Sequence, residues 1–157
     1  MSGAATVTVR RGRRDDAPLV LALADQLSAF PVPSWRTAHE IQRADDDVIR
    51  AALNGEAPGT VAYVAEGPGG LDGAVCLTTR EDYFTHEALA HIEVLAVDPA
   101  AQGRGVARAL MHAAEGWARE MGMNRISLNV WAQNERARGL YEHLGYAAEM
   151  MHYLKEL

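Results

Sequence analysis

The stretch VDPAAQGRGVARAL, residues 97–110, joins a segment typical of a strand to a segment typical of a helix. Gly103 and Gly105 leave the backbone at this junction without side chains. The first turn of a helix has unpaired N–H groups and carries partial positive charge, so it attracts anions. Arg104 and Arg108 add positive charge beside it. The stretch therefore predicts a binding site for a phosphate or pyrophosphate group.

Two well-known phosphate-binding patterns are excluded at this place. A Walker loop needs a Lys followed by Ser or Thr, which this stretch lacks. The dinucleotide-binding fingerprint needs a third glycine, and GRGVAR at 103–108 has two. On glycine spacing alone, a plain turn from strand to helix remains an alternative.

Working outward, periodicity predicts one α/β domain over residues 1–157. Alternating apolar residues predict strands over 6–11, 60–66, 71–81, 91–97, 125–131 and 147–157. Helical spacing predicts helices over 17–30, 37–54, 105–122 and 134–145. The turn residues GPGG between the second and third strands indicate a hairpin.

The first two predicted helices have clear apolar faces. The face of the first helix consists of Leu19, Leu23, Leu27 and Phe30. The second helix begins with a capping box of Thr37 and Glu40 and ends at Gly55. Its inward face consists of Ile41, Ala44, Val48 and Ala52, so Asp45, Asp46 and Asp47 are expected mostly outside.

Composition and charge narrow the class of protein. The chain has 157 residues, of which 48% are hydrophobic, and no run of 18 apolar residues. Its amino terminus lacks the apolar core of a secretory signal, so we expect a cytoplasmic protein with no membrane partner. The net charge of -6 argues against nucleic acid as a partner. The histidines lack metal-ligand spacing and Cys76 is the single cysteine, so we expect no metal and no internal disulfide.

The negative charge is concentrated in the middle of the chain. Residues 36–93 contain eleven acidic residues and four arginines, whereas residues 94–157 contain seven of each sign. A cationic ligand would be attracted to such a segment. An acidic surface that keeps the protein soluble is the alternative.

Two segments together resemble one enzyme family. Val97, Asp98 and Pro99, followed by QGRGVA at 102–107, resemble the Gln/Arg-x-x-Gly-x-Gly/Ala motif of the GCN5-related N-acetyltransferase (GNAT) family. NERARGLYEHLGY at 134–146 is similar to the second segment of that family. The resemblance implies a mixed, mostly antiparallel sheet of about six to seven strands, flanked by helices. It also implies that the strand ending at Val97 splays from the next strand, so that its free edge can pair with the pantetheine arm of acetyl-CoA.

The resemblance also implies which residues bind acetyl-CoA. The implied set consists of Leu95, Ala96, Val97, Gln102, Gly103, Arg104, Gly105, Val106, Ala107, Asn134 and Tyr141. Backbone N–H groups of 102–107 would surround the pyrophosphate, and one near Leu95 or Val97 would serve as the oxyanion donor. Asn134 is also a natural helix N-cap, so it can have both roles.

Acetyl transfer needs a proton donor for the departing thiolate and a base for the amine. Tyr141 matches the family tyrosine that protonates the sulfur; a core tyrosine is the alternative. For the base, Glu93 matches the family position best, and His91 lies two residues earlier. Regular alternation puts both side chains on the face of Val97, with Ile92, Val94 and Ala96 opposite. Partial burial would raise the pKa of Glu93 toward neutral, whereas substrate binding or solvent exposure is the alternative for both residues.

The resulting hypothesis is an acetyl-CoA-dependent N-acetyltransferase acting on a primary amine of a small cationic molecule. One alternative is acetylation of a protein at its N-terminus or at a lysine, and another is a CoA-binding sensor without catalysis. The last predicted strand, 147–157, ends apolar and could pair across a homodimer.

Overall fold

A computed structural model of the chain describes residues 6–29 and 31–157. Its centre is a sheet in the order β1-β2-β3-β4-β5, in which every pairing is antiparallel except that of β4 with β5. The strands are β1 (Thr8–Arg11), β2 (Thr60–Gly67), β3 (Gly70–Glu81), β4 (Ala88–Val97) and β5 (Ile126–Leu128). The helices are α1 (Ala17–Ala24), α2 (Ala38–Asn54), α3 (Val106–Glu120) and α4 (Glu135–His143). The expected α/β class and the hairpin of the second and third strands are confirmed.

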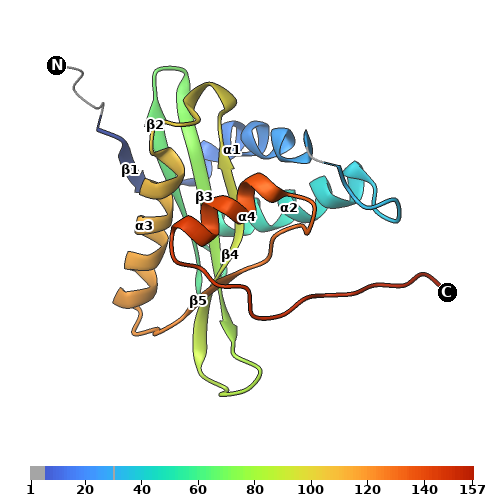
Figure 1. Cartoon of the computed structure of the whole chain (residues 1–157). Helices are drawn as coiled ribbons and strands as arrows, with labels where there is room; N and C mark the ends of the chain where they lie inside the picture. The colour runs from blue at the N-terminus through green and yellow to red at the C-terminus, as the bar shows by residue number, and fades with distance from the viewer. Residues whose placement is uncertain (1–5, 30) are drawn as a thin grey trace.

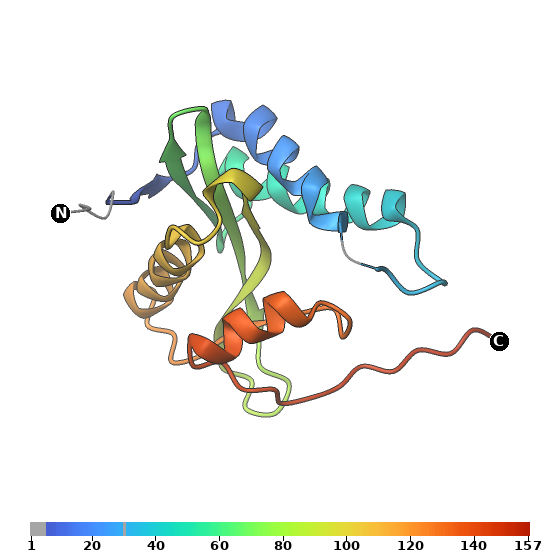
Figure 2. The same ribbon diagram turned by 45° about the horizontal axis from the view of Figure 1, so that its top comes forward.

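Helices cover both faces of the sheet (Figures 1 and 2). The apolar face of α3 packs on one side, where Leu110 and Met111 are fully buried against Val75 and Leu77. Helices α1 and α2 pack on the other side. Tyr141 of α4 packs at the margin of the α3 cluster. The sheet therefore lies between two helical layers.

The β4 strand contains a β-bulge at Glu93. Val94 pairs with Cys76 and Ile92 pairs with Leu77, so Glu93 stands opposite no residue of β3 in the backbone pairing. An extra residue reverses the alternation of side chains beyond it. The expectation that His91, Glu93 and Val97 share one face is therefore wrong.

Beyond the bulge, β4 and β5 separate. Their parallel pairing covers only Ala90–Ile92 with Ile126–Leu128. The residues from Glu93 to Val97 consequently have an unpaired edge on this side. The splayed strand pair that we expected is confirmed.

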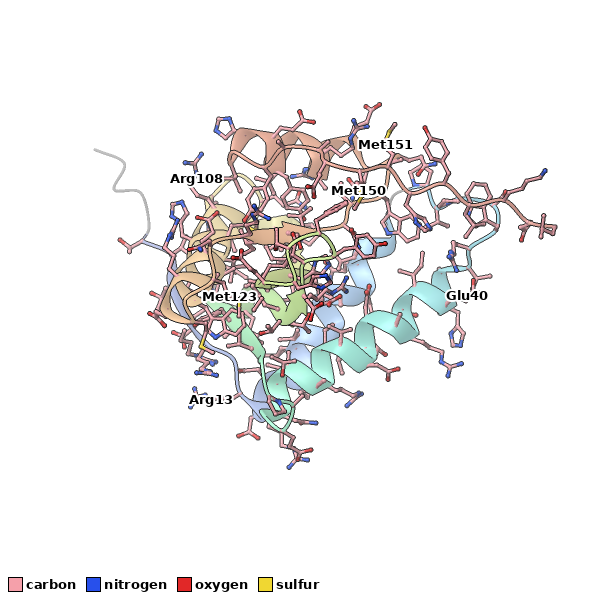
Figure 3. The ribbon with its side chains drawn as sticks, turned by 90° about the horizontal axis from the view of Figure 1, so that it is seen from below. Arg13, Glu40, Arg108, Met123, Met150 and Met151 are labelled. Atoms are coloured by element: carbon pink, nitrogen blue, oxygen red, sulfur yellow. The ribbon has the colours of Figure 1, made fainter. Side chains whose placement is uncertain are left out.

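The carboxyl-terminal segment corrects our strand count. Residues 147–157 have no regular secondary structure and run away from the sheet, so the sheet has five strands among the described residues rather than six or seven (Figure 1). β5 comprises only three residues, and within the part of the chain that the structure describes the segment that follows α4 joins no strand of the sheet. Met150, Met151 and Tyr153 are 72%, 78% and 82% exposed, and the two methionines are visible on this segment in Figure 3.

The ends of the first two helices follow from local chemistry. Thr37 accepts a hydrogen bond from the backbone of Glu40, and Gly55 ends α2 at a φ of 67°. The first helix ends earlier than expected, at Ala24, and continues as a 3₁₀ turn to Ala29. Phe30, expected on its face, lies outside the described residues. Within the described part of the chain, every helix is too short or too polar to cross a membrane.

Candidate active site

The junction between β4 and α3 has the conformation expected of an anion site. The Asp98 side chain accepts a hydrogen bond from the backbone N–H of Ala100 at 2.8 Å, which fixes the turn after β4. Helix α3 then begins after Gly105, whose φ is 81°, and no side chain caps it. Gly103 has a φ of 77°, and a Cβ at either glycine would have no neighbour within 4 Å. The first turn of α3 thus lacks a side-chain cap, and the two glycines leave open space beside it for a ligand that accepts its hydrogen bonds.

This junction opens into a cavity of about 700 Å³. The cavity runs along the unpaired edge of β4 and reaches α2, and Leu128 and Trp131 form the opposite side. At about 3.3 Å per residue, the free edge from Glu93 to Val97 is roughly 15 Å long. An extended ligand with amide groups can therefore lie along it as an added strand.

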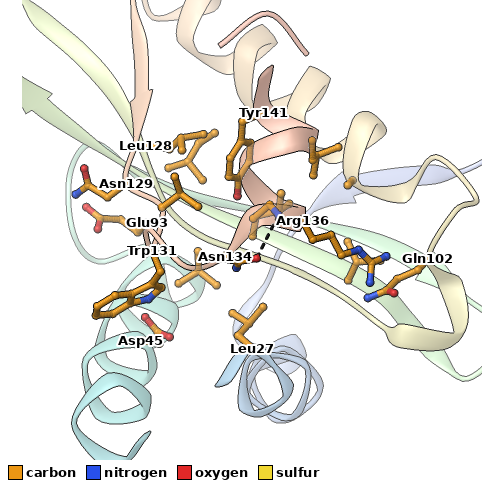
Figure 4. Close-up of a pocket in the computed structure, with 18 of the residues that line it drawn as sticks. Leu27, Asp45, Glu93, Gln102, Leu128, Asn129, Trp131, Asn134, Arg136 and Tyr141 are labelled. Atoms are coloured by element: carbon orange, nitrogen blue, oxygen red, sulfur yellow. Dashed lines mark hydrogen bonds between the residues drawn. The ribbon is translucent and has the colours of Figure 1, made fainter. Parts of the chain in front are cut away.

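The two ends of the cavity carry opposite charge. Arg108 and Arg136 lie with the glycine turn at one end, and Glu40, Asp45 and Glu93 lie toward α2, accompanied by Arg36. Figure 4 shows Gln102 and Arg136 on one side of the cavity and Asp45, Glu93 and Trp131 on the other. The cavity thus suits a ligand pair that is anionic at the α3 end and cationic at the α2 end.

Tyr141 lies between these two ends. Its side chain lines the cavity from α4, and its ring contacts Tyr146 edge-on at a centroid distance of 6.1 Å. Burial raises the pKa of Tyr141 above its ordinary value. No other described residue forms a hydrogen bond with its hydroxyl, which points into the cavity (Figure 4). The hydroxyl is therefore protonated at neutral pH and available to a ligand.

Glu93 projects into the cavity from the bulge. Its Oε1 accepts hydrogen bonds from Thr78 Oγ1 and Arg80 Nη2, both at 2.7 Å. Burial acts to raise the pKa of Glu93, but the hydrogen bonds from Thr78 and Arg80 outweigh it, so the pKa is lowered. Our expectation of a pKa shifted toward neutral is therefore wrong, and Glu93 is a carboxylate at neutral pH.

His91 lies away from the cavity. The residue is 4% exposed, and its Nδ1 forms a hydrogen bond with Ser127 Oγ at 2.7 Å. Burial and the positive charge of Arg80 lower the pKa of His91. It is thus a neutral side chain held between β4 and β5 at neutral pH.

Comparison with known proteins identifies the family. A sequence profile of the acetyltransferase (GNAT) family matches residues 21–146, which is more than half of the chain. The chain belongs to the GNAT family. Members of this family are acyltransferases that use acetyl-CoA as the donor.

Individual relatives support this assignment. Mycothiol acetyltransferase of Beutenbergia cavernae is 48% identical over 65 residues, which are 41% of this chain and 22% of that protein. The chain spans about a fifth of the length of the curated relatives it matches. A Pyrococcus furiosus protein assigned as an acetyltransferase has a TM-score of 0.74 and 25% identity, covering 97% of this chain and 100% of that one.

A further structural neighbour has a ligand. AAC(6')-Iy, solved with the bisubstrate analogue CoA-S-monomethyl-acetylneamine, has a TM-score of 0.72 and 20% identity over 98% of this chain and 100% of that one. At this identity the likeness shows the GNAT fold alone.

Most of the GNAT residues expected from the sequence line the cavity. They are Glu93, Leu95, Val97, Gln102, Gly103, Gly105, Val106, Ala107, Asn134 and Tyr141. The Asn134 side chain also accepts a hydrogen bond from Ala137 N at 3.2 Å, as expected of an N-cap. Their roles in binding and catalysis remain predictions.

Three expected residues do not line the cavity. The bulge leaves His91 on the opposite face from Val97, and Ala96 is fully buried against α1 and α2. Arg104 turns toward Asp72, with Nη1 3.7 Å from Oδ2. The positive side chains at the cavity are instead Arg36, Arg108 and Arg136.

Sequence reasoning missed Arg136 and Asp45. Arg136 follows the N-cap of α4, so its place was predictable once that helix was set beside the glycine turn. Asp45 was expected mostly outside, yet it is half-buried and lines the cavity. Asp45 lies four residues after Ile41 and three before Val48, so its position falls on the apolar face of the helix. A charged residue on such a face could have indicated a functional role. Among the described residues no three His, Cys, Asp or Glu side chains are grouped as a metal site.

Proposed function

We propose that this protein is an N-acetyltransferase that transfers the acetyl group of acetyl-CoA directly to a primary amine of a small cationic molecule. The observation that carries the proposal is one continuous cavity. It extends from the uncapped N-terminus of α3 to the acidic residues Glu40, Asp45 and Glu93, and the Tyr141 hydroxyl lies between these two ends. Acetyl-CoA supplies the thioester whose carbonyl carbon the amine attacks.

The residues at the α3 end would hold the donor. N–H groups of residues 103–107 and the guanidinium groups of Arg108 and Arg136 suit a pyrophosphate, whereas the N–H of Gln102 donates to the Pro99 carbonyl oxygen at 3.4 Å. The free edge of β4 suits the amides of the pantetheine arm, and an N–H near Leu95 or Val97 suits the carbonyl oxygen.

Glu93 and Tyr141 would manage the protons. The amine forms a bond to the carbonyl carbon, the carbon–sulfur bond breaks, and the amine loses a proton. Glu93, charged at neutral pH, takes that proton directly or through water. The Tyr141 hydroxyl donates a proton to the departing thiolate and is later reprotonated from solvent. His91 is not part of this scheme, because Ser127 holds it away from the cavity.

Release of free thiol from acetyl-CoA, measured against a panel of amines, tests the activity. We propose that the protein acts in the cytoplasm. The panel contains polyamines, aminosugars, amino-acid amides and basic peptides. Turnover of one small amine class supports the proposal. Turnover of peptides alone would support a protein acetyltransferase, and acetyl-CoA binding without any turnover would favour the sensor.

We further propose that the functional unit is a homodimer. The segment 147–157 is extended, exposed and rich in apolar side chains, and β5 is an edge strand. Exposed edges and apolar segments are seldom left uncovered. The segment of one copy would lie on the β5 edge of the other.

A further inference from the structure

Among the acidic side chains that line the cavity, Asp45 is the one without a hydrogen bond or ion pair to any described residue. Glu40 accepts a hydrogen bond from the Thr37 backbone at 2.8 Å, and Glu93 is held by Thr78 and Arg80. Asp45 lines the same cavity, yet it has no hydrogen bond or ion pair with any described residue. A half-buried carboxylate without a partner is costly, so its position calls for a cation.

The charged groups around Asp45 intensify this cost. Burial, then the negative charges of Asp46 and Glu93, raise the pKa of Asp45 to about 6. Glu40 lies on the same helix and adds to the negative wall, whereas Arg36 lies near Glu40 and forms no ion pair with Asp45. Above about pH 6 the carboxylate is thus charged and destabilised by its neighbours. An ammonium ion placed there would relieve the repulsion.

The side chains that line the cavity with Asp45 are compatible with an ammonium group. Figure 4 shows Asp45, Trp131 and Glu93 on the same side of the cavity. Trp131 supplies an aromatic wall, which is compatible with a cation or with its carbon chain. The glycine turn and the arginines that would hold the donor lie toward the other end, so the two ligands would not compete.

We propose that Asp45 is the specificity-determining residue for the acceptor, binding between α2 and Trp131 an ammonium group of the acceptor other than the amine that is acetylated. This inference rests on the proposed function, because it places the acceptor beside the donor site. It predicts that the protein selects ammonium compounds over uncharged compounds of equal shape.

Calorimetric titration of amines into the protein saturated with CoA tests the proposal without any turnover. The probes are 1,5-diaminopentane and lysine amide, which each carry two amines, with 1,5-pentanediol as the uncharged analogue of the first. The variants are Asp45→Asn and, as a matched control, Asp47→Asn, which removes an exposed carboxylate from the same helix. We expect Asp45→Asn to weaken the binding of the best amine about ten-fold or more, because a charge-assisted contact is lost. Asp47→Asn should change it less than two-fold.

The outcomes separate this inference from the proposed function. Amine binding to the wild type should weaken as the pH falls below about 6, because protonation removes the charge of Asp45. Equal affinity of wild type and Asp45→Asn for every probe, or equal binding of the diamine and the diol, overturns the role of Asp45. Absence of amine binding to the wild type overturns it as well. Failure of the wild type to bind CoA would instead overturn the proposed function.

Discussion

Tyr141 and Glu93 line the same cavity in contrasting surroundings. The Tyr141 hydroxyl has no hydrogen-bond partner among the described residues, whereas Glu93 is held by a hydroxyl and a guanidinium group. A proton donor should be free to meet its acceptor, and a charged group near the reacting amine should be held in place. These surroundings give each residue a distinct test.

Replacing Tyr141 with Phe should lower kcat about 100-fold, because the thiolate would leave without a positioned acid. The dissociation constant of acetyl-CoA should change less than two-fold. Steady-state kinetics and calorimetry measure the two quantities. Tyr146→Phe is the matched control, because Tyr146 does not line the cavity and its hydroxyl donates a hydrogen bond to Glu115 Oε1 at 3.2 Å. If Tyr141→Phe has the kcat of the wild type, Tyr141 is not the proton donor and its role is packing.

The pH dependence of kcat/KM distinguishes Glu93 from Asp45. The pKa of Glu93 is lowered, so Glu93 stays charged across the neutral range, whereas Asp45 titrates at about 6. Glu93→Gln should therefore lower kcat about ten-fold near pH 7.5 and move the acidic limb to lower pH, because burial and Asp46 still raise the pKa of Asp45 but the negative charge of Glu93 no longer adds to them. Complete loss of the limb in this variant would assign it to Glu93. Glu87→Gln, on the exposed β3–β4 loop, serves as the control.

At the element scale, the close approach of α3 to β3 positions the glycine turn. A Cβ at Gly73 would lie 2.8 Å from the backbone oxygen of Ala96 and 2.9 Å from Leu110 Cδ1. These contacts are too short, so β4 or α3 would have to move.

Gly73→Ala should lower the free energy of unfolding by about 1–3 kcal/mol, as overpacking typically does. It should also weaken acetyl-CoA binding, because the start of α3 shifts relative to β4. Gly116→Ala, in the same helix with no atom within 4 Å of the new Cβ, should raise the free energy of unfolding by about 0.5–1 kcal/mol. Urea denaturation of both variants measures the difference, and equal stability would contradict the packing argument.

Elements with strong local signals could be predicted from the sequence. Helix α2, with its capping box at Thr37 and left-handed end at Gly55, needed only local information. The bulge at Glu93 could not be predicted, because it depends on the pairing of β3 with β4 and leaves no mark in β4 alone. Because of that bulge, Glu93 reaches the cavity whereas His91 is buried beside Ser127.

At the scale of the whole molecule, side-chain alternation alone was not enough to predict whether the last segment forms a strand. Residues 147–157 have a strand-like pattern, but a strand needs an edge to pair with. The location of the site, by contrast, followed from two motifs at 102–107 and 134–146, because both converge on one cavity. The acidic residues of α2 that line the cavity, Glu40 and Asp45, could be assigned to the site only from the assembled fold, because the packing of α2 against the sheet brings them there.

Light scattering tests the proposed dimer. We expect the wild type to have twice the mass of one chain, and Met151→Glu to shift the population toward the monomer, since it places a charge in the apolar segment. Met121→Glu, at an exposed methionine just after α3, should leave the mass unchanged. A monomeric wild type would contradict the dimer and leave the cavity argument untouched.

Calorimetric titration of acetyl-CoA tests the central claim most directly, that the turn at 102–107 binds the donor. We expect one site per chain in the wild type and binding at least about 100-fold weaker in Gly105→Glu, whose carboxylate would enter the anion site. Gly122→Glu is the control, because its glycine has a similar φ of 76° at the far end of α3 and no neighbour within 4 Å. This control should bind acetyl-CoA like the wild type. Failure of the wild type to bind acetyl-CoA, or equal binding by Gly105→Glu, would contradict the account.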